Sequence, residues 1–257
     1  MLSHDPVKDT FILYNNRRVF QRVLNVPLED RFWGRSGPGA LRAIGHGKGD
    51  MVSKIILARH GRTAWHAEGR YAGTTDVPPD EVGIQQARRI ADRLEGAKID
   101  VVFSSPLSRC LEVAQKVADS HGLEVIVDDR LRELDLGRWD GEMVEDIVKR
   151  DGEILKRWTK DPTSVTIPGG ESLMAVQERS MDWLNDASAR YADGHVFASS
   201  HGGPIRAILA AVVGLPLSNI FRLTVDLASI SILNYMGKFS NLETMNERSH
   251  LDGLGDK

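Results

Sequence analysis

From Met51 onward, short apolar runs rich in β-branched residues alternate with longer segments of helical periodicity. The clearest strand-like runs are 55–58, 99–103 and 196–200, and a helix-like segment comes after each of them. Strands that alternate with helices predict a mostly parallel sheet that is covered on both faces. We therefore expect the α/β class: a single three-layer domain with a mostly parallel central sheet and helices on both faces.

Capping signals set the expected boundaries of these elements. Asp80 is a suitable N-cap for a helix over 81–94, while Pro106 and Gly122 are suitable start and stop signals for a helix over 107–121. Residues 62–79 are expected to form a polar loop. The other expected elements are helices over 142–158, 171–191 and 205–213 and strands over 124–127, 228–233 and 238–244.

The N-terminal part of the chain differs from the rest. Residues 1–50 have short apolar patches without a regular period, and a stretch rich in glycine and proline ends at Gly49. We expect this N-terminal extension to be largely disordered, with one short helix near 16–24. One hypothesis is that the natural chain begins at Met51, which directly precedes the first strand. The folded domain is then expected over 51–245, followed by a C-terminal tail over 246–257.

Composition narrows the range of partners. The chain has 257 residues and a formal net charge of -3, whereas nucleic-acid binders are usually basic, so we expect no nucleic-acid partner. Cys110 is the single cysteine, which excludes an internal disulfide and fits a reducing, cytoplasmic location. The apolar run 207–215 is far shorter than the roughly 20 residues that cross a bilayer, so no membrane partner is expected either.

Reactive polar groups follow three of the expected strands. Arg59-His60-Gly61 ends the first strand, Arg109 comes shortly after the second, and His201 ends the third. Because the carboxyl ends of parallel strands lie at one edge of a sheet, these groups are expected to converge. Burying two arginines together costs several kcal/mol per ion unless an anion is supplied. A phosphate dianion would supply it, so we expect a phosphate site.

The same region resembles the histidine phosphatase superfamily, in the branch shared by cofactor-dependent phosphoglycerate mutases and their phosphatase relatives. The resemblance extends over about 53–235 and implies that the catalytic domain is the folded domain expected over 51–245. The motifs that carry it, in the family's order, are Leu57-Ala58-Arg59-His60-Gly61-Arg62-Thr63, 83–87, Ser104-Ser105-Pro106-Leu107-Ser108-Arg109, Leu131-Arg132-Glu133, Gly137-Arg138-Trp139-Asp140-Gly141, Pro168-Gly169-Gly170-Glu171-Ser172 and Ser200-His201-Gly202-Gly203.

The resemblance implies a catalytic role for five residues. His60 would be the nucleophile that forms a phosphohistidine, and Arg59, Arg109 and His201 would hold the three equatorial oxygens of the phosphoryl group. Glu133 would protonate the leaving oxygen and then activate water. The residue chemistry agrees for His60, because a nucleophilic imidazole must be neutral and flanking arginines disfavour its protonated form. No metal ion or cofactor is implied, and an ion pair of Glu133 with Arg132 or Arg138 is the alternative for that carboxylate.

The expected substrate-binding residues extend around the phosphate loop. They are Arg59, Thr63, His66, Gly73, Arg109, His201 and Gly202. His66 stands where the family usually has asparagine; its imidazole can donate to a phosphate oxygen, and its protonation would make affinity pH-sensitive near neutrality. Arg62 stands where glutamate or glutamine is common and is expected to face solvent.

Three functions remain open at this point. The segment from Glu133 to Glu171 is short and mixed in charge, whereas related mutases carry a longer insertion with basic residues. This difference favours a metal-independent phosphomonoester hydrolase that acts on a small phosphorylated metabolite. The alternatives are a 2,3-bisphosphoglycerate-dependent phosphoglycerate mutase and a catalytically silent phosphate-binding module.

The sequence leaves the substrate-facing loops undetermined. The charges over 142–157 fit a solvated helix face or a substrate grip, and Trp139 fits packing or stacking on a substrate ring. The expected partner is a small-molecule phosphate ester whose identity stays open, and a homodimer is possible.

Overall fold

Strand β1 lies inside a six-stranded sheet with the order β3-β2-β4-β1-β5-β6. The computed structural model describes residues 52–254. β1, β2, β3 and β4 run parallel to one another, while β5 and β6 are antiparallel to their neighbours. The strands are β1 (Ser53–Arg59), β2 (Val101–Ser104), β3 (Val125–Val127), β4 (His195–Ser200), β5 (Ile230–Tyr235) and β6 (Asn241–Glu247).

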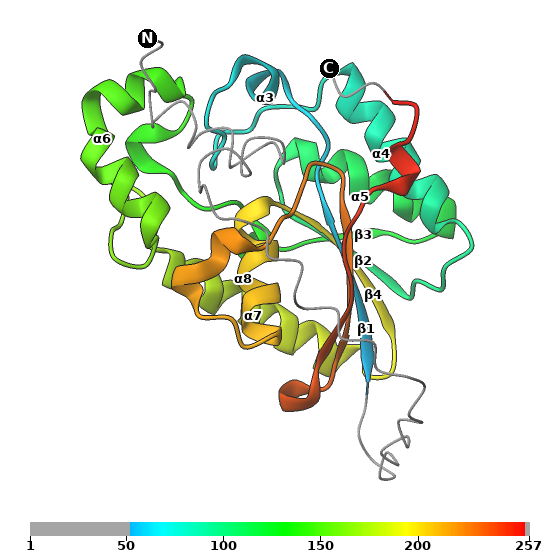
Figure 1. The fold of residues 1–257 in the computed structure, drawn as a ribbon. Coiled ribbons are helices and arrows are strands. Elements are labelled where there is room, and N and C mark those ends of the chain that lie inside the picture. The colour runs from blue at the N-terminus through cyan, green and yellow to red at the C-terminus, as the bar shows by residue number, and fades with distance from the viewer. Residues whose placement is uncertain (1–51, 255–257) are drawn as a thin grey trace, which may run out of the picture. The chain divides into compact units, whose positions relative to one another are not determined.

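Helices cover both faces of this sheet (Figure 1). Alternate β1 side chains point to opposite faces: Ile55 and Leu57 belong to the core cluster with α7 and α8, and Ile56 and Ala58 belong to the cluster with α4 and α5. The helices are α3 (Ala64–Glu68), α4 (Glu81–Leu94), α5 (Ser108–His121), α6 (Val144–Lys160), α7 (Leu173–Arg190) and α8 (Gly202–Val212). The expected three-layer α/β fold is confirmed.

Short 3-10 helices fill several connections. They are Asp129–Leu131, Gly137–Trp139, Leu217–Arg222, Gly237–Phe239 and Ser249–Leu251. The predicted capping of the longer helices is confirmed: the Asp80 carboxylate accepts from the N–H of Gly83, and Gly122 ends α5 in the left-handed conformation. Among the described residues, no helix is both long and apolar enough to cross a membrane.

Several element boundaries differ from the predicted ones; for example, the strand expected over 228–233 lies at Ile230–Tyr235. The expected loop over 62–79 contains α3, a single turn ended by Gly69 at a φ of 77°. The expected strand over 238–244 begins at Asn241, because Gly237–Phe239 first forms a 3-10 turn. α8 begins at Gly202 rather than at 205, since Pro204 is tolerated in the first helical turn, where its missing N–H costs nothing.

The predicted C-terminal boundary falls inside β6. This strand continues to Glu247, and the side chain of Leu251 is buried in the core cluster with α4 and α5. Residues 246–251 therefore continue the domain rather than forming a tail. The expectations for 1–50, including the helix near 16–24 and the start at Met51, lie outside the described residues.

Candidate active site

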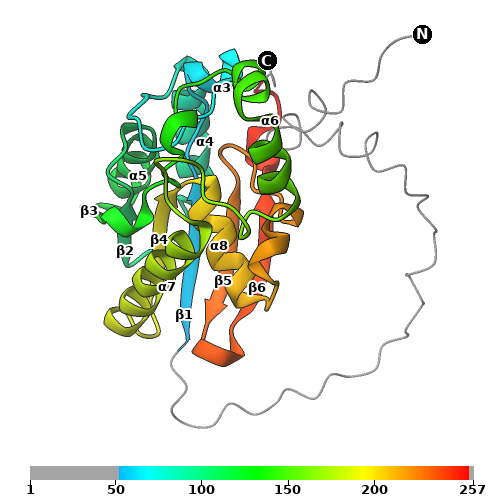
Figure 2. The ribbon, with the colours of Figure 1, turned by 90° about the vertical axis from the view of Figure 1, so that its left-hand side faces the viewer.

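The register of the parallel strands brings the predicted site residues to one edge of the sheet. Arg59 lies opposite Ser200, and Ser104 lies opposite Ser199, so β1, β2 and β4 end at the same level. The N–H of His60 donates to the carbonyl of Ser200 at 3.1 Å. His60 and His201 thus directly follow β1 and β4, which are neighbours in the sheet (Figure 2).

The imidazole of His60 is held in one tautomer. Its Nδ1 lies 2.7 Å from the carbonyl oxygen of Gly61, and because a carbonyl can only accept, Nδ1 must carry the proton. Nε2 then keeps its lone pair. Burial lowers the pKa of His60 well below its usual value, and Arg109, His201, Arg59 and His66 lower it further. The ring is therefore a neutral imidazole with Nε2 available as a nucleophile.

The imidazole rings of His60, His66 and His201 lie close together. The ring centroid of His60 lies 5.0 Å from that of His201 and 5.3 Å from that of His66. Nε2 of His201 is 2.8 Å from the hydroxyl of Ser105 and 3.3 Å from the sulfur of Cys110. Burial lowers the pKa of His201 well below its usual value, with Arg109 and Arg59 adding to the effect. His201 is thus also neutral and firmly held.

Both predicted arginines are buried beside these rings. Nη1 of Arg59 donates to the carbonyl of Val225 at 2.8 Å. Arg109, which is fully buried, donates to the carbonyls of Thr75 and Gly73 at 2.9 and 2.6 Å. Within the described part of the chain, Nε of Arg109 has no hydrogen-bond partner. A buried guanidinium with an unfilled donor is a strong site for an oxyanion, because an unpaired buried charge is costly.

Glu133 is held by backbone groups rather than by an arginine. Its side chain is 4% exposed, and Oε1 accepts from the N–H of Leu134 at 2.8 Å and from the N–H of Gly203 at 3.0 Å. Arg132 and Arg138 pair instead with Asp129 and Asp151. The alternative ion pair of Glu133 is therefore absent from the described residues. Both bonds engage Oε1, so Oε2 is the oxygen that can exchange a proton with a ligand.

Thr63 and His66 form the turn that follows the nucleophile. The hydroxyl of Thr63 lies 2.7 Å from Nδ1 of His66. Burial, Arg59 and Arg109 lower the pKa of His66 to about 3. This lowered pKa contradicts the expectation that His66 titrates near neutrality. His66 is a neutral partner of Thr63 here.

Arg62 does not face solvent freely as expected. Its Nε pairs with the carboxylate of Asp80 at 2.8 Å, and its side chain is only 23% exposed. This ion pair connects the loop that follows His60 to the start of α4. Glycines make the approach possible: a Cβ on Gly61 would lie 2.5 Å from the carbonyl oxygen of Gly83, and a Cβ on Gly83 would overlap the carbonyl of Arg62. The positioning role of Gly83 was not predicted from the sequence.

The predicted substrate-binding glycines, Gly73 and Gly202, lie next to charged side chains. The N–H of Gly73 donates to the carboxylate of Asp140 at 2.7 Å, and its carbonyl accepts from Arg109, so protein partners occupy both backbone groups. Gly202 lies where a Cβ would come within 2.8 Å of Nη1 of Arg206. The close approach of Gly203 to Glu133 was missed, although the second glycine of the Gly202-Gly203 pair was the available signal.

We expect Gly203→Ala to lower kcat/KM strongly while changing the melting temperature little. The added Cβ would overlap Oε1 of Glu133, and displacing a reacting group by about 1 Å can cost on the order of 100-fold in rate. The measurement is kcat/KM for an alkyl phosphate beside the melting temperature. Gly96→Ala is the matched control, because nothing lies within 4 Å of a Cβ there. Full activity in Gly203→Ala would mean that Glu133 does not need its present position.

The lowered pKa values predict that His60 and His201 do not titrate near neutrality. A histidine whose pKa is lowered stays neutral to a lower pH than usual, so neither ring should take up a proton between about pH 8 and pH 5, whereas unfolded histidines titrate near 6.5. Imidazole ¹⁵N–¹H NMR spectra in phosphate-free buffer measure this directly, with the urea-unfolded chain as the reference. Protonation of His60 near pH 6.5 would contradict the electrostatic description of the site.

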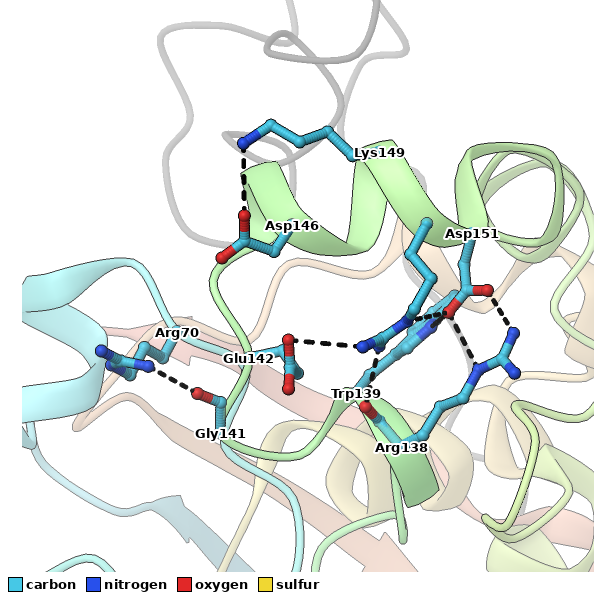
Figure 3. Close-up of polar contacts among 9 residues, drawn as sticks. Arg70, Arg138, Trp139, Gly141, Glu142, Asp146, Lys149 and Asp151 are labelled. Atoms are coloured by element: carbon cyan, nitrogen blue, oxygen red, sulfur yellow. Dashed lines mark hydrogen bonds and ion pairs between the residues drawn. The ribbon is translucent and has the colours of Figure 1, made fainter.

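The segment between Glu133 and Glu171 contains α6, and several of its charges are paired within this segment (Figure 3). The buried carboxylate of Asp151 accepts from Arg138, from Arg150 and from Nε1 of Trp139, and Lys149 pairs with Asp146. These contacts favour a paired helix face over a substrate grip. Trp139 is fully buried and packs edge-on against Trp158, so its role is packing.

Two neutral histidines lie beside two buried arginines at the carboxyl edge of a mostly parallel sheet. This arrangement is typical of an α/β protein that binds a phosphoryl group. Among the described residues, no group of three histidine, cysteine, aspartate or glutamate side chains is placed to hold a metal ion. The chain belongs to the histidine phosphatase superfamily (branch 1), whose family model matches residues 55–248.

Several relatives of this chain bear the names of enzymes. Phosphoserine phosphatase 1 of Hydrogenobacter thermophilus is 35% identical over 77% of this chain and 94% of the relative. A protein of Yersinia pestis that bears the name of a phosphoglycerate mutase, GpmB, is 29% identical over 77% of this chain and 95% of the relative. The structure of a mycobacterial glucosyl-3-phosphoglycerate phosphatase is 31% identical, with a TM-score of 0.72 over 76% of this chain and 99% of that one. The family and these relatives together identify a phosphatase enzyme.

Proposed function

We propose that this enzyme is a metal-independent phosphomonoester hydrolase that forms a phosphohistidine on His60. The observation that carries the proposal is the bond from Nδ1 of His60 to the carbonyl of Gly61. This bond leaves the lone pair of Nε2 beside Arg59 and Arg109. A neutral nucleophile between two cations is what attack on a phosphate dianion requires.

The first half of the proposed reaction transfers the phosphoryl group. Arg59, Arg109 and His201 hold its non-bridging oxygens and stabilise the charge that they carry in the transition state. Nε2 of His60 bonds to phosphorus while the ester P–O bond breaks. Protonated Glu133 donates its proton from Oε2 to the leaving oxygen, which departs as the alcohol.

The second half hydrolyses the phosphohistidine. Glu133, now a carboxylate, takes a proton from a water molecule as the water oxygen attacks phosphorus. The P–N bond breaks, its electron pair returns to Nε2, and inorganic phosphate leaves. Glu133 is again protonated, so both groups are restored for the next cycle.

Two features support hydrolysis over the mutase alternative. Several charges of α6 are paired with neighbouring side chains, as Asp151 is with Arg138, which favours a paired helix face over a basic grip for a second anionic group. The relatives named as phosphatases include the one with 35% identity. We propose a small phosphorylated metabolite as substrate and a cytoplasmic location, in keeping with the single cysteine.

The test is phosphate release from a panel of esters in the presence of EDTA. The panel contains an aryl phosphate, phosphoserine, sugar phosphates, nucleotides and 3-phosphoglycerate, and conversion of 3-phosphoglycerate to 2-phosphoglycerate is followed in parallel. Release without added metal is the expected result. Isomerisation without release would assign the chain to the mutases, and neither activity would favour the silent binding module.

A further inference from the structure

A loop from the C-terminal half of the chain crosses the end of β1 and contacts both the nucleophile and its neighbour. In this loop, defined as residues 223–229, the carbonyl of Val225 accepts from Nη1 of Arg59 at 2.8 Å. The carbonyl of Ser229 accepts from the N–H of Arg59 at 3.0 Å, and the N–H of Ala228 donates to the carbonyl of His60 at 3.0 Å. The 223–229 loop therefore fixes the main chain at His60 and the direction of the Arg59 guanidinium.

The conformation of this loop is unfavourable for its own sequence. Ala228 is buried at a φ of 54°, in the left-handed region that costs an alanine about 1 to 2 kcal/mol. Such a backbone persists only where its surroundings impose it. Within the loop, the N–H of Ser229 donates to the carbonyl of Asp226 at 3.2 Å, and residues outside the loop add further contacts.

Asn246, near the end of β6, supplies the main contacts. Its side-chain Oδ1 accepts from the N–H of Asp226 at 2.7 Å, and its Nδ2 donates to Oδ2 of Asp226 at 2.9 Å. Asn246 is itself at a φ of 55°, which asparagine tolerates better than most residues. One amide thus satisfies both the main chain and the side chain of the residue next to Val225.

Two further residues of the same segment hold the loop. Nη1 of Arg248 lies 3.5 Å from Oδ2 of Asp226, and Nε2 of His250 lies 3.0 Å from the carbonyl of Ala228. Residues 246–250 thus contact Asp226 and Ala228, while Arg206 of α8 donates to the carbonyl of Leu223 at 2.9 Å.

We propose that Asn246 is a positioning residue that, through Asp226 and Val225, aims the guanidinium of Arg59 at the phosphoryl group. The proposal rests on the proposed function, in which Arg59 holds a phosphoryl oxygen. A guanidinium binds phosphate through a planar fork of donors, so a tilt of that plane loses directed hydrogen bonds even where the charge remains. Loss of the Asn246 amide should therefore weaken oxyanion binding without unfolding the protein.

The first variant is Asn246→Gly, because glycine adopts the positive φ without strain while losing both side-chain bonds. We expect the Kd for inorganic phosphate, measured by titration calorimetry, to rise about 10-fold, with a similar fall in kcat/KM for an aryl phosphate. Asn246→Ala should show the same change in Kd, although its strained backbone should lower the melting temperature further.

Asp193→Gly is the matched control. Asp193 also has a positive φ, of 59°, and its carboxylate also accepts from a main-chain N–H, that of Val52. It lies before the start of β4, whereas the site lies where this strand ends. The Kd of this variant for phosphate should stay within about twofold of that of the unaltered protein, because Asp193 contacts the chain just before the start of β1, whereas Arg59 ends that strand.

The outcomes separate this proposal from the proposed function. A lower melting temperature in Asn246→Gly with unchanged phosphate Kd and kcat/KM would show a merely structural role and overturn the positioning role alone. A raised phosphate Kd in a chain whose unaltered form hydrolyses none of the esters would support the positioning of Arg59 while contradicting hydrolysis. An equal rise in Asp193→Gly would also overturn the proposal, because the effect would then follow from any such substitution.

Discussion

Replacing His60 with alanine should abolish turnover and leave no phosphorylated enzyme. We expect kcat to fall by about 10⁴-fold or more, because the nucleophile and its partners act as a unit. The neighbouring rings are poor substitutes: His201 is engaged by Ser105, and His66 is engaged by Thr63. Rapid acid-free quenching after mixing with ³²P-labelled substrate measures the phosphoenzyme, and brief exposure to acid should then release the label.

The matched control for this experiment is His121→Ala. His121 ends α5, where its ring nitrogens lie within hydrogen-bond distance of the carbonyls of Val117 and Ala97. The His121→Ala substitution therefore removes an imidazole that has no contact with the site, and ³²P labelling of the enzyme should persist. An acid-labile label in the His60→Ala variant would reassign the nucleophile to another group.

Replacing Glu133 with glutamine should separate substrates by their leaving groups. The amide oxygen can still accept from Leu134 and Gly203, so the fold of the site is kept while the transferable proton is lost. We expect kcat/KM to fall by about 10² to 10⁴ for alkyl phosphates, whose leaving oxygen needs that proton. The fall should be much smaller for p-nitrophenyl phosphate, whose leaving group departs as a stable anion.

The quantity measured for Glu133→Gln is kcat/KM, because it reports the steps up to departure of the alcohol. Glu133 is also proposed to activate water in the second half-reaction, so kcat alone would mix the two roles. The aryl ester serves as the internal control for folding and phosphate binding. An equal loss of kcat/KM on alkyl and aryl esters would contradict the role of Glu133 as the acid.

The sequence predicted the sheet and the charged centre because both depend on local pattern. The apolar run 55–58 is long enough to be a buried strand, and parallel pairing alone then aligns Arg59 with Ser200. Capping by Asp80 and Gly122 is likewise local. Elements that depend on periodicity and on short-range chemistry could therefore be predicted from the sequence alone.

Contacts between distant segments could not be predicted in this way. No local signal relates Asn246 to Asp226 or joins Val225 to Arg59, since each pair is brought together only by the completed sheet. The C-terminal tail expected over 246–257 shows the same limit, because the side chains of Asn246, Arg248 and His250 contact the 223–229 loop. The pairing of Arg62 with Asp80 was missed for the same reason.

The packing of Cys110 has a consequence for redox chemistry. Its thiol donates to the carbonyl of Ser200 and lies 3.3 Å from His201, and burial raises its pKa to about 12. Oxidants and alkylating agents attack the thiolate, and a buried thiol with a raised pKa is far less ionised at neutral pH than a free cysteine. A sulfur atom in contact with the reaction centre is thereby kept from reacting, and the enzyme is expected to keep its activity under oxidative conditions that inactivate enzymes with exposed active-site cysteines.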